Sequence, residues 1–234
     1  MKIGIICAGD KEIEPFIPYI QNNKKSMKAM LTFYEGVING MEIVALFCGV
    51  CKTNAAIATQ ILIDNYGIEA IINAGTAGGM NEELQIFDTV ICTESAHHDV
   101  HEGILTGFHP WMDSVYFKAD KTLLALSKNA VKRIKSEGKI YFGRMVTGEA
   151  FIEDDGRDEI NAAFEPLTVD METASIAHTC YVNGIPYIAI RTVTDTATHA
   201  GSDHFEKNLP IASAISKDIV LELLTEMKTY HNVK

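Results

Sequence analysis

Short, nearly unbroken apolar runs recur along the chain, and they constrain its fold more than any other feature. Three of them are KIGIIC at 2–7, MEIVALFC at 41–48 and PYIAIRTVT at 186–194. Strands that are apolar on both sides are typical of a sheet covered on both faces. Further strands are predicted at about 31–37, 69–74, 87–93, 139–147 and 167–170, and helices at about 52–65, 120–136, 171–183 and 208–229. Strands that alternate with helices predict an α/β fold with a largely parallel sheet, or with a mixed one.

Length and charge narrow the class of protein. The 234 residues predict one domain spanning residues 1–234, because no linker or repeat interrupts the pattern. A net charge of −11 argues against nucleic acid as a partner, since backbone phosphates bind clustered Lys and Arg. The one basic cluster, NNKKSMK at 22–28, is predicted to be a solvated loop. The apolar stretch before Gly9 is too short for a signal peptide or a membrane helix, so we expect a soluble, cytoplasmic protein with no membrane partner.

The cysteine and histidine patterns do not predict a metal site. Five cysteines, an odd number, fit buried reduced thiols better than a disulfide framework. Cys48 and Cys51 form a C-x-x-C pair, but no second pair completes a zinc site. His97, His98 and His101 lack the spacing of a helical zinc motif.

Polar residues follow four of the predicted strands. Glu12 comes after the first strand, GTAGG at 75–79 after the fourth, Asp170-Met171-Glu172 after the strand near 167, and Asp195 after the last. The carboxyl ends of parallel strands share one edge of a sheet, where ligands bind, so these residues should converge. Each also has an ordinary structural explanation: Asp170 could cap a helix, and GTAGG could be a tight turn.

Five segments, MKIGIICAGDKEIEPF, IINAGTAGG, TGEAFI, VDMETASIAH and RTVTD, occur in order along the chain. Together they resemble the 5'-methylthioadenosine/S-adenosylhomocysteine nucleosidases, within the wider nucleoside phosphorylase family. The resemblance implies a single-domain three-layer α/β/α sandwich on a mixed central sheet, usually a homodimer, with no cofactor and no metal. It also implies a small-molecule nucleoside substrate and hydrolysis of the bond that joins adenine to a 5'-thio-substituted ribose.

The resemblance also implies roles for particular residues. Glu12 matches the general base that activates water, and Asp195 the acid that protonates the purine at ring position seven. Met171 and Glu172 match the ribose clamp. The remaining matches are with substrate-binding positions: Phe151 and Ile152 at the base, Phe205 in the 5'-alkylthio pocket, and Thr76 and Arg191 near the water and the ribose. Gly78 is a further substrate-binding candidate.

The stretch from His97 to Tyr116 is the least regular part of the chain and is predicted to be a long loop. It contains the only tryptophan, Trp111. In the family that the chain resembles, this region lies near the dimer interface and can lend an aromatic residue to the partner's site. Phe108 is the candidate for that role here.

Hydrolysis and phosphorolysis differ in the need to hold phosphate. The first arginine of the chain is Arg133, so residues 1–132 offer none around Glu12 or GTAGG. Phosphate is usually held by arginine, and a carboxylate at Glu12 would repel it. We therefore expect a hydrolase. The alternatives are a phosphorylase that uses Arg191 and a catalytically silent nucleoside-binding protein; the sequence also leaves open 5'-deoxyadenosine and 6-amino-6-deoxyfutalosine as substrates.

Overall fold

A single mixed sheet organises the molecule. The computed structural model describes residues 1–101, 103–109, 112–153, 156–199 and 201–233. Within these residues ten strands form one sheet; nine pair in the order β10-β6-β8-β9-β5-β1-β4-β3-β2, and β7 pairs with β6 outside this order. The strands are β1 (Lys2–Cys7), β2 (Gln21–Lys28), β3 (Leu31–Ile38), β4 (Met41–Phe47), β5 (Ala70–Gly79), β6 (Thr89–His97), β7 (Phe117–Lys118), β8 (Ile140–Thr147), β9 (Thr168–Asp170) and β10 (Tyr187–Asp195).

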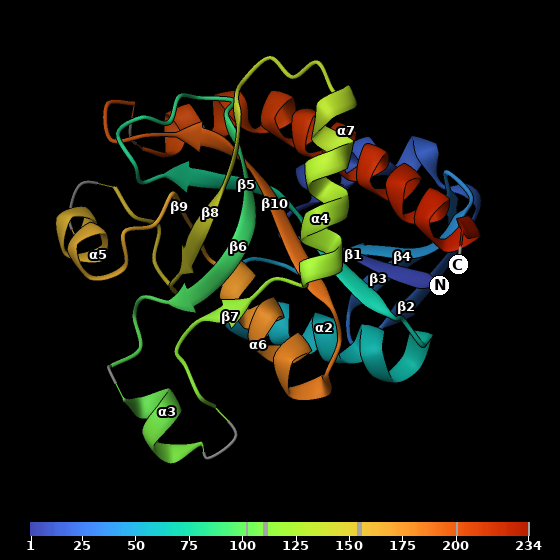
Figure 1. Cartoon of the computed structure of the whole chain (residues 1–234), viewed down its shortest axis with the longest axis horizontal. Helices are drawn as coiled ribbons and strands as arrows, with labels where there is room; N and C mark the ends of the chain where they lie inside the picture. Colours follow the sequence, from blue (N-terminus) through green and yellow to red (C-terminus); the bar gives the residue numbers. More distant parts are fainter. Residues whose placement is uncertain (102, 110–111, 154–155, 200, 234) are drawn as a thin grey trace.

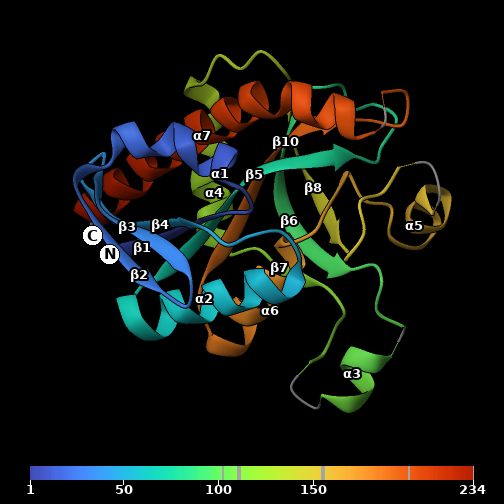
Figure 2. The same cartoon turned by 180° about the vertical axis from the view of Figure 1, so that it is seen from behind.

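Helices cover both faces of this sheet, which gives the predicted three layers (Figure 1). They are α1 (Asp10–Ile13), α2 (Lys52–Tyr66), α3 (Ile104–Phe108), α4 (Lys121–Ala130), α5 (Arg157–Phe164), α6 (Thr173–Asn183) and α7 (Ser202–Val233), with 3₁₀ turns η1 (Glu14–Tyr19) and η2 (Val131–Arg133). The helices α1, α4 and α7 lie on one face, and α2 and α6 on the other (Figure 2). The predicted α/β fold with a mixed sheet is confirmed.

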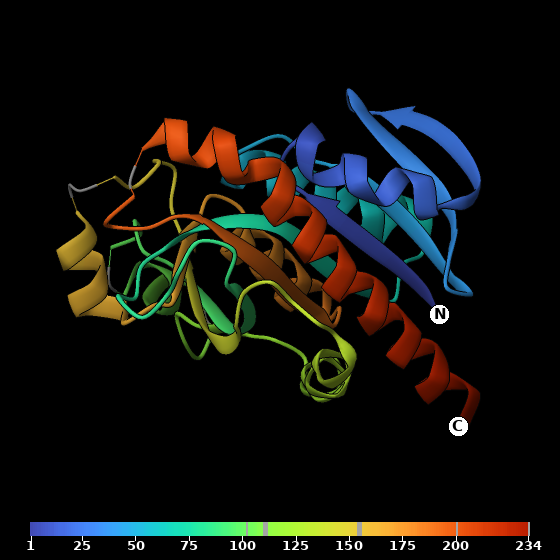
Figure 3. The same ribbon diagram turned by 90° about the horizontal axis from the view of Figure 1, so that it is seen from above.

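The central strands are buried from end to end, as their apolar runs predict. Every residue of β10 is buried, and so are all but one residue of β5. The long helix α7 crosses both strands diagonally and packs on them (Figure 3). Its Ser216 donates a hydrogen bond to the carbonyl of Ile190 at 3.0 Å and accepts one from the N–H of Gly75 at 3.1 Å. One hydroxyl therefore joins α7 to the two strands that carry the site.

The sheet closes on itself at one end, and this was not expected. β10 pairs with β6 and also with β5, so that β5, β10, β6, β8 and β9 form a ring. β1, β5 and β10 are parallel, but β9 runs antiparallel to β5. The prediction that Asp170 and Glu172 reach the site from a parallel strand is therefore wrong. They reach it because the short strand β9 runs back along the end of β5.

Several predicted boundaries need correction. Residues 22–28 are not a loop but belong to β2, an exposed edge strand paired with β3. Lysines are common on edge strands because their charge discourages pairing with other chains. GTAGG is not a turn after a strand but the second half of β5. The helix α5 was not predicted, because its eight residues are too few to show a clear periodicity.

The region from His97 to Tyr116 is also more ordered than predicted. β6 extends to His97, and α3 forms within the supposed loop and projects from the body of the molecule (Figure 1). Trp111 lies outside the described residues. No helix in the described part of the chain is long and apolar enough to cross a membrane.

Candidate active site

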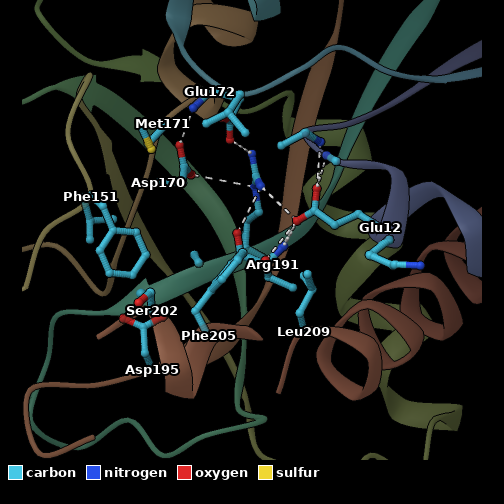
Figure 4. Close-up of a pocket in the computed structure, with 18 of the residues that line it drawn as sticks. Glu12, Phe151, Asp170, Met171, Glu172, Arg191, Asp195, Ser202, Phe205 and Leu209 are labelled. Atoms are coloured by element: carbon cyan, nitrogen blue, oxygen red, sulfur yellow. Dashed lines mark hydrogen bonds and ion pairs between the residues drawn. The ribbon is translucent and has the colours of Figure 1, made fainter. Parts of the chain in front are cut away.

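A cavity of about 370 Å³ opens where β1, β5, β9 and β10 end (Figure 4). All ten catalytic and substrate-binding candidates from the sequence line it: Glu12, Thr76, Gly78, Phe151, Ile152, Met171, Glu172, Arg191, Asp195 and Phe205. In the close-up, Glu12 lies on one side of Arg191, and Phe151 and Asp195 lie on the other. The structure thus brings together residues from six separate segments of the chain, as the sequence predicted.

Glu12 is a buried carboxylate held by four donors. Its Oε2 accepts hydrogen bonds from the N–H groups of Ala8 at 2.7 Å and Gly9 at 3.0 Å. Its Oε1 accepts from the N–H of Thr76 at 2.7 Å and from the Thr76 hydroxyl at 2.9 Å. These bonds fix the carboxylate between β1 and β5. Thr76 contributes both its backbone N–H and its hydroxyl to this arrangement.

Gly75 makes room for the Glu12 carboxylate. A Cβ atom at this position would lie 2.3 Å from Glu12 Oε1, far inside van der Waals contact. Any other residue would push the carboxylate away from β5 or distort the strand. This requirement explains the first glycine of GTAGG better than a turn does.

Arg191 sits at the centre of the site and is fully occupied by protein groups. Its Nη2 donates to Glu172 Oε2 at 3.1 Å, its Nη1 to the carbonyl of Thr76 at 3.0 Å, and its Nε to the Thr173 hydroxyl at 3.3 Å. The carboxylates of Glu12 and Asp170 each lie 3.7 Å from it. Burial alone would lower the pKa of the guanidinium, but the three surrounding carboxylates raise it, so Arg191 stays charged.

Glu172 reaches the cavity with one strong partner for each oxygen. Oε1 accepts a hydrogen bond from the backbone N–H of Cys51 at 3.0 Å, while Oε2 faces Arg191. Burial raises its pKa to about 7; Arg191 opposes that shift, and the neighbouring charge of Asp170 adds to it. Cys51 adopts φ 87° and ψ 159°, a strained conformation for a residue with a side chain. The C-x-x-C segment therefore contributes to the site through the hydrogen bond from the Cys51 backbone N–H to Glu172.

Asp170 lines the cavity and also holds the surrounding backbone in place. Its Oδ1 accepts hydrogen bonds from the Thr147 hydroxyl at 2.7 Å and from the N–H groups of Glu172 at 2.9 Å and Thr173 at 2.8 Å. Asp170 thus binds two N–H groups at the start of α6, although the N-cap position belongs to Glu172 and not to Asp170 as one alternative had it, and it also contributes charge beside Arg191. One residue serves both purposes.

Asp195 is the last residue of β10 and lies away from the carboxylates that surround Arg191 (Figure 4). The Thr194 hydroxyl donates to its Oδ1 at 2.8 Å, and a Cβ atom on Gly78 would lie 3.1 Å from its Oδ2. Burial raises the pKa of this carboxyl above its ordinary value, and the Thr194 hydrogen bond and the charge of Arg157 oppose the shift. A carboxyl group in such surroundings is suited to donate a proton.

Two aromatic rings frame the side of the cavity near Asp195. Phe151 and Phe205 meet edge to face, with ring centroids 6.0 Å apart. Phe205 belongs to the first turn of α7, which begins at Ser202, earlier than the predicted start at 208. Phe151 is 43% exposed, which leaves its face available to a planar ligand.

Sequence reasoning missed part of the lining. Val50, Ala150, Ser202 and Leu209 also face the cavity. These are small or apolar residues without reactive groups, so nothing in the sequence distinguishes them from core residues. Ala150 alone carried a signal, because it precedes Phe151 in a segment that had been singled out.

The histidines after β6 do not gather into a metal site. Within the described residues, no group of three or more His, Cys, Asp or Glu side chains is arranged to hold a metal ion. The absence of a metal or cofactor stays a prediction. All five cysteines are free thiols, and four of them are buried.

Comparison with known proteins identifies the family. The family model of the phosphorylase superfamily matches residues 2–225. A 5'-methylthioadenosine/S-adenosylhomocysteine nucleosidase from Actinobacillus succinogenes is 34% identical over 233 residues, which cover 97% of this chain and 100% of that protein. One from an Exiguobacterium species is 34% identical, with 97% and 99% covered.

Solved structures agree with the sequence relatives. The nucleosidase of the same name from Neisseria meningitidis, in complex with methylthio-immucillin-A, has a TM-score of 0.88 at 31% identity and covers 96% of this chain and 98% of its own. That from Colwellia psychrerythraea, in complex with adenine, has a TM-score of 0.88 at 29% identity, with 97% and 95% covered. Fold and site therefore define a member of the phosphorylase superfamily. Within it, the chain belongs to the 5'-methylthioadenosine/S-adenosylhomocysteine nucleosidases, which confirms the family predicted from the motifs.

Proposed function

We propose that this protein hydrolyses the N-ribosyl bond of 5'-methylthioadenosine and S-adenosylhomocysteine, releasing adenine and the thioribose. The observation that carries the proposal is the placement of three carboxylates, Glu12, Glu172 and Asp195, around one cavity whose central arginine is already occupied. The names of the relatives point to the same reaction.

Asp195 acts as the acid. Adenine is a poor leaving group unless it is protonated, and a buried carboxyl with a raised pKa holds a proton nearer to neutral pH than an exposed one. Phe151 stacks on the base and the Ile152 backbone recognises it, beside Asp195. In this arrangement the proton passes to ring position seven as the bond to the sugar breaks.

Glu12 acts as the base on the other side of Arg191, where the close-up places it. Water attacks the anomeric carbon from the face opposite the leaving base, and Glu12 takes its proton. Two separated carboxylates with room for a water molecule are the arrangement of inverting glycosidases. Gly78 and Thr76 line the wall between the two sides, and Phe205 lines the 5'-alkylthio pocket.

Glu172 holds the ribose hydroxyls, with Met171 against the sugar. Its ionised form stabilises the positive charge that develops on the ribose in the transition state more than it stabilises the neutral substrate. Arg191 keeps that carboxylate in place.

Phosphorolysis is the alternative reaction, and the environment of Arg191 disfavours it. The guanidinium donates to Glu172, Thr76 and Thr173 and has Glu12 and Asp170 nearby. Lys11, the other cation at the cavity, pairs with Glu14 at 3.3 Å in an exposed position. A phosphate ion would have to displace these carboxylates.

The test is adenine release from 5'-methylthioadenosine in phosphate-free buffer. We expect release, and we expect none from the analogue with carbon in place of nitrogen at ring position seven, which Asp195 cannot protonate in the same way. Cleavage of both compounds at equal rates would contradict the proposed acid step, and cleavage of neither would favour the binding-only alternative.

We also propose that residues 1–234 act as a single nucleosidase domain, in the cytoplasm, as a homodimer. Phe108 and Ile104 on the projecting helix α3 are 77% and 44% exposed, which suits an interface that brings an aromatic residue to the partner. Light scattering on the wild type and on Phe108→Glu measures this, with a dimer expected for the former and weakened association for the latter. A fully active wild-type monomer would contradict the homodimer.

A further inference from the structure

Arg157, at the start of α5, is a buried cation for which the described residues supply no ion-pair partner. Arg157 is 6% exposed. Nε donates to the carbonyl of Glu153 at 3.2 Å and Nη1 to the carbonyl of Gly79 at 2.5 Å, whereas Nη2 has no partner. No acidic side chain in the described parts of the chain forms an ion pair with it within 4.0 Å. A buried charge is costly unless it is compensated, so its retention calls for an explanation.

The Arg157 guanidinium binds the β5 residue that follows the one in contact with Asp195. Gly78 is the β5 partner of Asp195 in the sheet, and its Cα faces the Asp195 carboxylate directly. The next residue, Gly79, carries the carbonyl that holds Arg157. The end of β5 therefore has the carboxyl group packed against one glycine and the guanidinium bound to the next.

Few other groups act on Asp195. Thr194 on β10 donates to it, and His204 on α7 is the other charged or titratable group that favours its ionised form. Thr194 is neutral, and His204 is only partly buried. Arg157 is the permanent, buried charge among them, because guanidinium does not deprotonate in proteins.

We propose that Arg157 is a positioning residue whose charge stabilises the Asp195 carboxylate left behind when the proton has passed to the purine. The inference rests on the proposed function of Asp195 as the acid. In that step the O–H bond of Asp195 breaks, an N–H bond forms at ring position seven, and the electron pair of the N-ribosyl bond stays with adenine. A cation close to the carboxyl makes the loss of its proton easier.

A purely structural role is the competing explanation, since Arg157 also ties the segment after Ile152 to β5. The two roles predict different pH dependences. Removal of the charge should raise the pKa of Asp195, so that the acid stays protonated to higher pH but donates less readily. Loss of a structural tie would lower turnover at every pH without moving the profile.

The experiment compares kcat against pH for the wild type and four variants. Arg157→Gln can still donate a hydrogen bond but carries no charge, and Arg157→Lys keeps the charge. Asn161→Ala is the matched control, because Asn161 on the same helix donates to the carbonyl of Met80 at 3.3 Å and is neutral. Thermal unfolding of each variant reports stability separately, and His204→Asn shows how much of the alkaline limb belongs to that histidine.

We expect Arg157→Gln to move the alkaline limb of kcat to higher pH and to lower the plateau by roughly tenfold or less, since the charge acts without direct contact. Arg157→Lys should keep the limb of the wild type. Asn161→Ala should lower stability without moving the limb. A folded Arg157→Gln variant whose alkaline limb does not move would overturn the inference. If that variant does not fold, an alkaline limb of Arg157→Lys that is displaced from that of the wild type would overturn it instead. If the wild type itself releases no adenine, it is the proposed function that fails.

Discussion

At the scale of single residues, the three carboxylates of the site differ in how the protein holds them. Among the described residues, four hydrogen bonds reach Glu12 and two reach Glu172, whereas Asp195 accepts one, from the Thr194 side chain. The four donors fix the Glu12 carboxylate in place, whereas burial raises the pKa of Asp195. The environments therefore separate base from acid in the way the chemistry requires.

The substitutions Asp195→Asn and Glu12→Gln should have different effects on stability. Both should lower kcat by about 10² or more, because each removes a proton-transfer group. Asp195→Asn should leave the free energy of unfolding at neutral pH unchanged or raise it, because burial raises the pKa of this carboxyl and the amide carries no charge. In Glu12→Gln one oxygen becomes an NH₂ group that faces N–H donors, so it should also unfold more easily. Adenine-release kinetics and urea denaturation measure both quantities; activity retained in either variant would contradict the assigned roles.

Glu172→Gln should stabilise the protein more at pH 8 than at pH 5. Glu172 has a pKa of about 7 in the folded state against an ordinary 4.5, so between these values the folded protein holds a proton that the unfolded chain has released. The stability contribution of this group therefore falls as pH rises through that window, and the neutral amide does not titrate. Urea denaturation of both proteins at the two pH values measures the difference. A difference that does not change with pH would show that Glu172 titrates normally.

At the scale of elements, the sequence predicted strands and helices better than their directions and ends. The buried strands were visible because both of their faces are apolar, as in β10. The reversal of β9 was not visible, because three residues carry no directional signal and the pairing is set by the closure of the sheet. GTAGG was placed after a strand, with a tight turn as one alternative, because glycines are rare in strands, whereas here Gly75 and Gly78 are the places where Glu12 and Asp195 approach the strand.

Asp170→Ala should destabilise the junction of β8, β9 and α6. The Asp170 carboxylate satisfies three buried donors, and their loss should cost about 2 to 4 kcal/mol of unfolding free energy. Asp170→Asn is the control, because its amide oxygen can still accept from the same donors. Chemical denaturation measures both variants, and equal stability of Asp170→Ala and the wild type would contradict this account of the junction.

At the scale of the whole molecule, the closed part of the sheet turns distant segments into one site. All ten of the catalytic and substrate-binding candidates line the same cavity, although they come from positions 12 to 205. Reactive side chains at strand ends were recognisable in the sequence. The apolar wall formed by Val50, Ala150 and Leu209 was not, since its location depends on how α2 and α7 pack.

The central claim is that water, and not phosphate, attacks the sugar. The most direct measurement is the identity of the sugar formed from 5'-methylthioadenosine in buffer that contains abundant phosphate, followed by phosphorus and proton NMR. The carboxylates around Arg191 predict free methylthioribose, formed at a rate that does not depend on phosphate. Accumulation of the sugar 1-phosphate would contradict the claim and would mean that Arg191 can release its carboxylates to bind phosphate.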